Sequence, residues 1–400
     1  MDAAERARDA AEARLQGDGR QYGAARVDLT SFPAVAIDPP GTGLKDDAVA
    51  YDAAENVLYV HIADAASTLL GAEAAEKGAS RALWHAALAR GEAVYADTRG
   101  GTGDLPLLPP AATAMCCLST SRPTECISLR LPLQPDGAAA LDQAELVRSV
   151  APPIFALTYA TANSWLDRGG HAVLDAAAAA AASLPNFEHS TPQDGRITRV
   201  SRGKAGKAVA TRRVRSRAHA LVDVLLSAYS GAAERTAAEA GAAVPYRHSG
   251  ATRLGTAPLR RYADLLAQRQ LGAVLGDGRK PLPRDAVARA VVAARTTAGK
   301  RRAARSVASR ALLLEAFSAA VDGQRKATGL TYAVVHDARA TGVGTEVYVA
   351  DAGTSGAVRG VPRAMTPLPK GKAVPVRVAG VDLRTGKLKL DAHGPWRGEE

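Results

Sequence analysis

The stretch AIDPPGTGLKDDA, residues 36–48, gathers three carboxylates around a stiff turn. An apolar run ends in Asp38, a Pro-Pro-Gly turn follows, and the adjacent acids Asp46 and Asp47 come just before the next apolar stretch. If both apolar runs are strands, the carboxylates lie at one edge of a sheet. Oxygen ligands of this kind suit Mg²⁺ or Mn²⁺ rather than zinc, and shared carboxylates are typical of two-cation phosphoryl-transfer sites. Alone the pattern is weak, because acids beside Pro and Gly are usually ordinary turn residues.

Charge points to a class of partner. The 400 residues include 51 basic and 40 acidic ones, a net charge of +11, which favours a polyanionic partner such as nucleic acid. Two stretches without acids, residues 196–217 and 289–310, hold many of the basic side chains. Each is either a solvated face or part of a groove that follows phosphates.

Composition and the N-terminus exclude other classes. A hydrophobic share of 47% is enough for a sizeable core and for more than one domain. No apolar stretch approaches the ~20 residues that cross a bilayer, and residues 1–19 lack the apolar core of a secretory signal. The three cysteines show no zinc-ligand spacing, so reduced thiols are expected. The sequence therefore predicts a cytoplasmic protein, with an organelle left open and secretion excluded.

Local patterns predict the order of helices and strands. Strands are expected over 34–37 and 57–62, a loop over 99–110, and helices over 1–17, 72–90, 154–168, 176–182 and 215–240. The segment TAPLRRYADLLAQRQL, residues 256–271, predicts a helix that Thr256 caps and that has Pro258 in its first turn.

Beyond a boundary near residues 323–330 the pattern changes to short strands. These are TYAVVH, TEVYVA, GAVRGV, AVPVRVAGVD and KLKLDA, five within about 65 residues. They suit a small five-stranded OB-type barrel, a fold that often binds single-stranded nucleic acid. A purely structural barrel is the alternative.

Six segments in order resemble the ribonuclease II / ribonuclease R family, whose catalytic region is the RNB domain. They are AIDPPGTGLKDDA (36–48), YVHIADAAS (59–67), RGEAVYADTRGGTGDLPLLPP (90–110), ALTYATANSWL (156–166), HALVDVLLSAY (219–229) and TAPLRRYADLLAQRQL (256–271). The resemblance implies an α+β fold, an RNB domain with a mixed sheet and surrounding helices, followed by the barrel. The expected division is a polar helical segment over 1–25, the RNB domain over 26–325, the OB-fold barrel over 326–393 and a tail over 394–400.

The resemblance also implies an activity, the processive hydrolysis of single-stranded RNA from its 3′ end to nucleoside 5′-monophosphates. Carried over to this sequence, Asp38, Asp46 and Asp47 would bind Mg²⁺, with Mn²⁺ as an alternative. Asp46 would be tied most closely to the chemical step. Arg260 would hold the scissile phosphate and stabilise its charge in the transition state.

Three further residues are expected at the RNA. Tyr159 would position the 3′-terminal nucleotide by stacking, Asp223 would contact its sugar or base, and Arg261 would serve the path of the backbone. The bland alternatives are a helix-surface aromatic for Tyr159, a helix-face salt bridge for Asp223 and a solvated basic face for Arg261. The implied partner is single-stranded RNA, for a monomeric chain that an RNA-decay complex could include.

The chain departs from the family pattern in ways that leave a second function open. Leu44 stands where the family usually has another aspartate, so the second cation would be weakened unless a neighbouring acid substitutes. Ala257 replaces a serine, and Ala304 falls where some members have a glutamate. The family's two N-terminal cold-shock barrels have no counterpart, which implies reduced processivity or a part of a longer product. The alternative is a catalytically weakened RNA-binding protein on an RNB scaffold; a DNA nuclease is disfavoured because the family acts on RNA.

Overall fold

The computed structural model describes most of the chain, in segments. The described residues are 26–71, 78–94, 105–185, 197–202, 208–212, 216–245, 254–301, 314, 331–341, 344–349, 354–359, 373–382, 384–385 and 387–392. They fall into two compact units, one of Met1–Val94, Leu105–Pro192 and Arg215–Lys300, the other of Tyr95–Asp104, Gln193–Val214 and Arg301–Glu400. The helix predicted over 1–17, the boundary near 325 and Ala304 lie outside the described residues.

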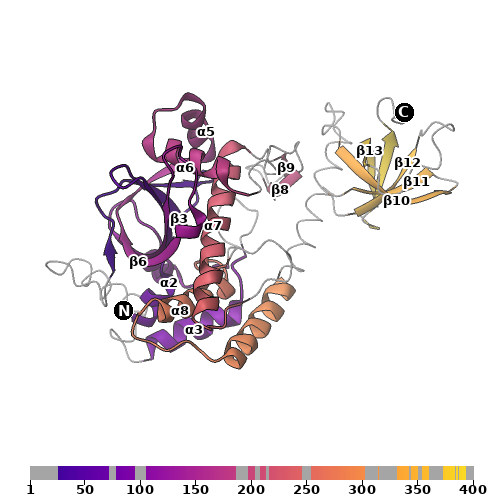
Figure 1. Ribbon diagram of the computed structural model, residues 1–400. Helices are drawn as coiled ribbons and strands as arrows, with labels where there is room; N and C mark the ends of the chain where they lie inside the picture. The colour runs from indigo at the N-terminus through magenta and orange to yellow at the C-terminus, as the bar shows by residue number, and fades with distance from the viewer. Residues whose placement is uncertain are drawn as a thin grey trace. The chain divides into compact units, whose positions relative to one another are not determined.

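A mixed seven-stranded sheet forms the centre of the first unit (Figure 1). Its strands are β1 (Val27–Asp28), β2 (Ala34–Asp38), β3 (Asp47–Asp52), β4 (Val57–Ala63), β5 (Thr124–Pro132), β6 (Glu145–Ala151) and β7 (Ile154–Thr158), in the order β1-β6-β5-β4-β3-β2-β7. The pairs β1–β6 and β2–β7 are parallel and the others antiparallel. The predicted α+β class with a mixed sheet is thus confirmed, and so are the strands expected over 34–37 and 57–62.

Helices complete the first unit, and three of them make the main contacts with the sheet. The helices are α2 (Ala65–Gly71), α3 (Ala79–Arg90), α4 (Pro110–Cys116), α5 (Tyr159–Arg168), α6 (Ala172–Ser183), α7 (Arg217–Glu239) and α8 (Tyr262–Val274), followed by helical residues 284–301. The long α7 packs against β4, β5 and β6, and its buried alanines, leucines and valines join those of α5 and α6 in one apolar core (Figure 1). None of the described helices is long and apolar enough to span a membrane.

The predicted helices at 176–182 and 215–240 are confirmed by α6 and α7, whereas two predicted helix starts are wrong. Residues 154–158 form β7 instead of a first helical turn, because they pair with all of β2, and the Thr158 side chain then caps α5 by accepting the Thr161 N–H. A short apolar run such as this fits either element until its partner is known. The second helix begins at Tyr262 instead of Thr256, because residues 91–93 take backbone groups that the earlier start would need, as described below.

The C-terminal strands were predicted at their observed places. They are β10 (Thr331–Thr341), β11 (Gly344–Val349), β12 (Thr354–Arg359), β13 (Ala373–Asp382) and β14 (Lys387–Ala392), which pair in the closed order β10-β11-β12-β14-β13. Buried and exposed positions alternate along β14, as expected for a sheet with one covered face. Within the first basic stretch, β8 (Ile197–Arg202) and β9 (Ala208–Arg212) form a two-stranded sheet that the sequence did not predict.

Candidate active site

The acidic loop runs between β2 and β3 and is fixed by the sheet at both ends. Asp38 ends β2 beside Thr158 of β7, and Asp47 begins β3 opposite Ile62 of β4. Asp46 lies between, and its carbonyl accepts the Ala63 N–H at 2.9 Å. The loop is therefore held by the sheet on both sides, which brings carboxylates to one edge as the sequence predicted.

Asp46 is bound by a segment more than two hundred residues away in sequence. The Leu259 N–H donates to Asp46 Oδ1 at 3.0 Å, and Arg260 Nε lies 3.4 Å from Oδ2. The Asp46 side chain is buried, whereas that of Arg260 is 39% exposed. Both oxygens of one carboxylate are thus oriented by the TAPLRRY segment, and the guanidinium beside it remains accessible to a ligand.

The TAPLRRY segment is itself braced from two directions. The Ala93 N–H donates to the Arg260 carbonyl at 2.8 Å, and the Ala257 N–H donates to Asp264 Oδ2 at 3.1 Å. Arg261 lies between the carboxylates of Glu92 at 3.9 Å and Asp264 at 3.6 Å. The Tyr262 N–H also donates to the Gly91 carbonyl at 3.0 Å. A helix starting at Thr256 would need this N–H and the Arg260 carbonyl for its own hydrogen bonds, so the helix begins later. Arg261 braces the segment here, and its contact with RNA stays a prediction.

Burial sets the protonation of the two central carboxyls. Burial raises the pKa of Asp46 to about 6, against the lowering effect of Arg260 and the Leu259 N–H, and the charges of Asp264 and Asp38 raise it further. Burial also raises the pKa of Asp38, and Lys45 and Arg260 partly offset it. Both carboxylates are held ionised at a cost, which a bound cation would relieve.

Lys45 is a component of the site that the sequence analysis missed. Its Nζ lies 3.5 Å from Asp38 Oδ2 and donates to the Thr42 carbonyl at 3.2 Å. Its side chain is only 15% exposed. The sequence did offer an indication, because a basic residue stands between Leu44 and Asp46 in a loop whose other charged residues are acidic.

The described residues contain no group of three or more His, Cys, Asp or Glu side chains placed to hold a metal ion. Asp38 lies close enough to Asp46 for its charge to raise the pKa of Asp46, but Asp47 does not complete such a group with them. Leu44 is half-buried in the loop and offers no oxygen ligand. The three aspartates of the predicted metal site are therefore brought to one edge without being gathered around one point.

Tyr159 and Asp223 lie in a second cluster, where α5 meets α7. The Tyr159 ring stacks on His219, with centroids 3.6 Å apart and planes 5° from parallel. His219 Nδ1 lies 2.7 Å from Ser216 Oγ in the capping box of α7, and Asp223 follows four residues later on the same helix face. The Ala218 N–H donates to Asn163 Oδ1, which fixes the two helices. The sequence analysis missed His219, which only the cap pattern before α7 could have suggested.

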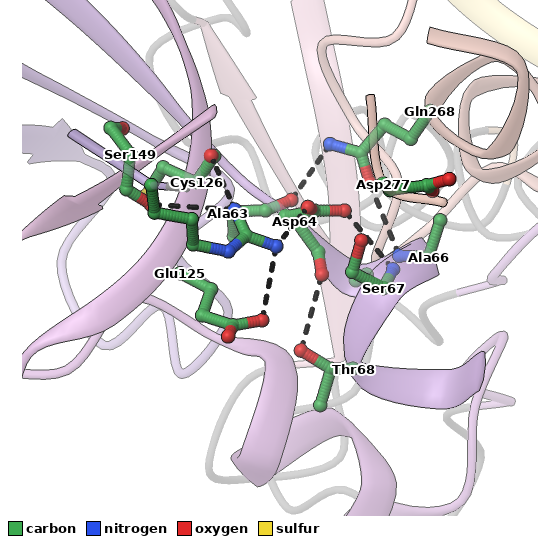
Figure 2. A network of polar contacts seen from close by, with 12 residues as sticks. Ala63, Asp64, Ala66, Ser67, Thr68, Glu125, Cys126, Ser149, Gln268 and Asp277 are labelled. Atoms are coloured by element: carbon green, nitrogen blue, oxygen red, sulfur yellow. Dashed lines mark hydrogen bonds and ion pairs between the residues drawn. The ribbon is translucent and has the colours of Figure 1, made fainter. Parts of the chain in front are cut away.

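The segment YVHIADAAS supplies structure rather than site residues. Asp64 is buried and pairs with Arg26 at 2.7 Å. Its other oxygen accepts the Ser67 N–H at the start of α2 (Figure 2). Arg26 also contacts Glu125 at 3.1 Å. Burial lowers the pKa of His61 to about 4, so this histidine is a neutral core residue and not a general base at neutral pH.

Comparison with known proteins identifies the same region. A family model described as the RNB domain matches residues 26–249, more than half of the chain. The two-unit structure is similar to Mycoplasma genitalium RNase R in complex with ribose-methylated single-stranded RNA, with 15% identity, a TM-score of 0.71, and coverage of 97% of this chain and 75% of that one. No curated protein sequence matches the chain.

Two further solved structures are similar at the level of the fold. One is an active-site mutant of the Dss1 exoribonuclease from Candida glabrata, with 15% identity, a TM-score of 0.72, and coverage of 96% of this chain and 57% of that one. The other is yeast Ssd1, a pseudonuclease, with 14% identity, a TM-score of 0.58, and coverage of 85% and 51%. The fold therefore occurs both in an exoribonuclease and in a pseudonuclease.

Proposed function

Since this chain belongs to the RNB-domain ribonuclease II / ribonuclease R family, we propose that it is a metal-dependent 3′-to-5′ exoribonuclease. Its products would be nucleoside 5′-monophosphates, and its substrate single-stranded RNA. The observation that carries the proposal is the contact of Asp46 with Leu259 and Arg260. In this contact a buried carboxylate, which can hold a cation, lies beside an accessible guanidinium, which can stabilise charge on a phosphate.

The residues present fit a hard divalent cation by the chemistry of their donors. Asp38 and Asp46 offer carboxylate oxygens that burial makes costly to ionise, and in the proposal they and Asp47 hold Mg²⁺, with Mn²⁺ as the alternative. When bound, the cation would activate water and stabilise charge on the phosphate. Asp46 would orient the groups at the reacting phosphorus. Arg260 would turn from Asp46 to the phosphate oxygens, to which its planar fork can donate two hydrogen bonds.

In the proposal the rest of the chain guides RNA. Tyr159 would stack on the terminal base, Asp223 would contact its sugar or base, and Arg261 would lie along the backbone path. We propose that residues 326–393, after the catalytic region 26–325, are an OB-type barrel that binds single-stranded RNA. Exposed basic residues on its strands support this, namely Arg359, Arg377, Lys387 and Lys389. We place the protein in the cytoplasm as a monomer, with an RNA-decay complex as a further partner.

A specific observation favours a second candidate function, RNA binding without efficient cleavage. Leu44 removes one carboxylate, and the fold is similar to that of a pseudonuclease. Asp46 and Arg260 remain in contact here, which weighs for catalysis. The deciding experiment is a time course of 5′-labelled single-stranded RNA on a denaturing gel with Mg²⁺, Mn²⁺ or EDTA. Progressive shortening from the 3′ end that requires metal supports the exonuclease, whereas intact RNA that shifts on a native gel supports the binding protein.

The raised pKa of Asp46 predicts how stability depends on pH without metal. Because the pKa is about 6 in the folded chain and near 3.8 when unfolded, the folded state holds the extra proton between these values. In EDTA, the native chain should therefore lose up to roughly 3 kcal/mol relative to Asp46→Asn as the pH rises from about 4 to about 7. Urea unfolding of both proteins at several pH values measures this, and added Mn²⁺ should restore stability at pH 7. Equal pH dependence in the two proteins would refute it.

The stacked pair Tyr159–His219 predicts an effect on substrate binding. Removing the supporting ring in His219→Ala should raise KM for RNA by roughly 2- to 10-fold with a smaller change in kcat, as expected for loss of one aromatic pair. His219→Phe should restore KM. Ser216→Ala is the matched control, since it breaks the contact of the cap while leaving the stacked ring in place. An unchanged KM in His219→Ala would mean that Tyr159 does not stack on the RNA base, or that His219 does not support it.

A further inference from the structure

We propose that the Lys45 ammonium takes the place of a second divalent cation, so that the active site of this chain holds one divalent cation. The inference rests on the proposed function and concerns the same site. This chain has no carboxylate at position 44, yet Asp46 of the same loop keeps its contacts with Leu259 and Arg260. A lysine in place of the second cation accounts for both features.

Lys45 is built into the loop rather than attached to its surface. Its N–H donates to Cys117 Sγ at 3.0 Å and its carbonyl accepts the Leu118 N–H at 3.1 Å, so the backbone on both sides of its Cα is fixed. The ammonium then has two oxygens within reach, Asp38 Oδ2 and the Thr42 carbonyl. A flexible lysine would have to lose conformational freedom to reach a substrate, whereas this one is already placed.

The charges at the site favour one divalent cation over two. Asp38 pairs with Lys45 and Asp46 with Arg260. Of the three carboxylates that would hold a cation, two are therefore already neutralised. A second divalent ion would lie close to the ammonium and meet a repulsion that grows as water is excluded. Leu44, next to Lys45, supplies no oxygen to offset that repulsion. An ammonium is itself a compact phosphate-binding charge, so Lys45 can contact a phosphate oxygen where a second cation would otherwise stand.

The test counts bound metal and measures hydrolysis in the same variants. Mn²⁺ bound per chain is measured by electron paramagnetic resonance of the free ion, for the native chain, Lys45→Met, Leu44→Asp and the double variant Leu44→Asp/Lys45→Met. We expect one Mn²⁺ in the native chain and two in the double variant. Hydrolysis of 5′-labelled single-stranded RNA should fall roughly 100-fold in Lys45→Met, as when one charge-stabilising donor is removed, and recover in the double variant.

The controls separate this inference from the proposed function. Lys280→Met makes the same exchange at an exposed position and should change neither the count nor the rate. Should Lys45→Met fail to fold, Lys45→Gln replaces it. Two Mn²⁺ in the native chain, or a native hydrolysis rate in folded Lys45→Met, overturns the inference. If no protein in the series hydrolyses RNA, the exonuclease proposal fails by itself. In that case the number of bound Mn²⁺ ions still tests Lys45. A rise from one ion in the native chain to two in Leu44→Asp/Lys45→Met supports its role, and one ion in both proteins overturns it.

Discussion

The Asp46→Asn variant is expected to shorten single-stranded RNA at least roughly 10³-fold more slowly than the native chain, while still binding it. The loss follows from the charge. The asparagine oxygen can still accept the Leu259 N–H, so the TAPLRRY segment should keep its position. The amide group cannot hold a cation or face Arg260 as a carboxylate does. The change thus removes chemistry while leaving the shape of the site in place.

The matched control for this variant is Asp285→Asn. Asp285 pairs with Arg289 on an exposed helix, and an exposed pair of this kind contributes little to stability. Its removal should leave hydrolysis unchanged. Hydrolysis is followed on denaturing gels and binding by fluorescence anisotropy of labelled RNA with Mg²⁺. A rate within about 10-fold of the native one corresponds to a rise in activation free energy of at most about 1.4 kcal/mol. If Asp46→Asn hydrolyses RNA at such a rate, Asp46 is not the residue closest to the chemical step.

Elements defined by a continuous local pattern could be predicted from the sequence. The apolar runs of β2 and β4, the alanine-rich α6 and the periodic α7 were all expected near their observed bounds. The first turn of the α5 prediction was wrong because Ile154–Thr158 has a strand partner, β2, that no local pattern reveals. Periodicity reports burial of a face and not the identity of the neighbour.

The candidate site could be predicted only as a set of residue types. The family resemblance put Asp46 and Arg260 in one active site, but the contact between them joins segments that only the folded chain brings together. The predicted start of α8 was wrong for the same reason, since residues 91–93 take the Tyr262 N–H and the Arg260 carbonyl. Lys45 and His219 were missed because their partners, Asp38 and Tyr159, define their roles and a spacing rule does not.

The second large effect concerns the buried ion pair of Arg26 and Asp64. Both side chains are almost fully buried, and Asp64 also accepts the Ser67 N–H at the start of α2 (Figure 2). Burial opposes ionisation of Asp64, but the Arg26 guanidinium outweighs it, so the pKa of Asp64 is lowered. Its contribution to stability is therefore present above the ordinary aspartate pKa and is lost as the pH falls through the lowered value.

Removing either partner leaves the other charge buried without its main counterion. We expect Arg26→Met or Asp64→Asn to lower the free energy of unfolding by about 3–5 kcal/mol at pH 7. Glu125→Gln should cost less, since Glu125 is the more exposed of the two acids that contact Arg26. Urea unfolding followed by circular dichroism at pH 7 gives these differences for the unit that contains the sheet.

The double variant Arg26→Met/Asp64→Asn tests whether an unpaired charge, and not a lost contact, causes the effect. Because neither charge then remains buried, the double variant should be more stable than either single one. If the double variant instead loses the sum of the two single losses in unfolding free energy, the two residues act independently. The ion pair then has no role in joining β4 to the start of the sheet. Folded Asp64→Asn should hydrolyse RNA with the native kcat, since Asp64 stabilises the scaffold and does not belong to the candidate site.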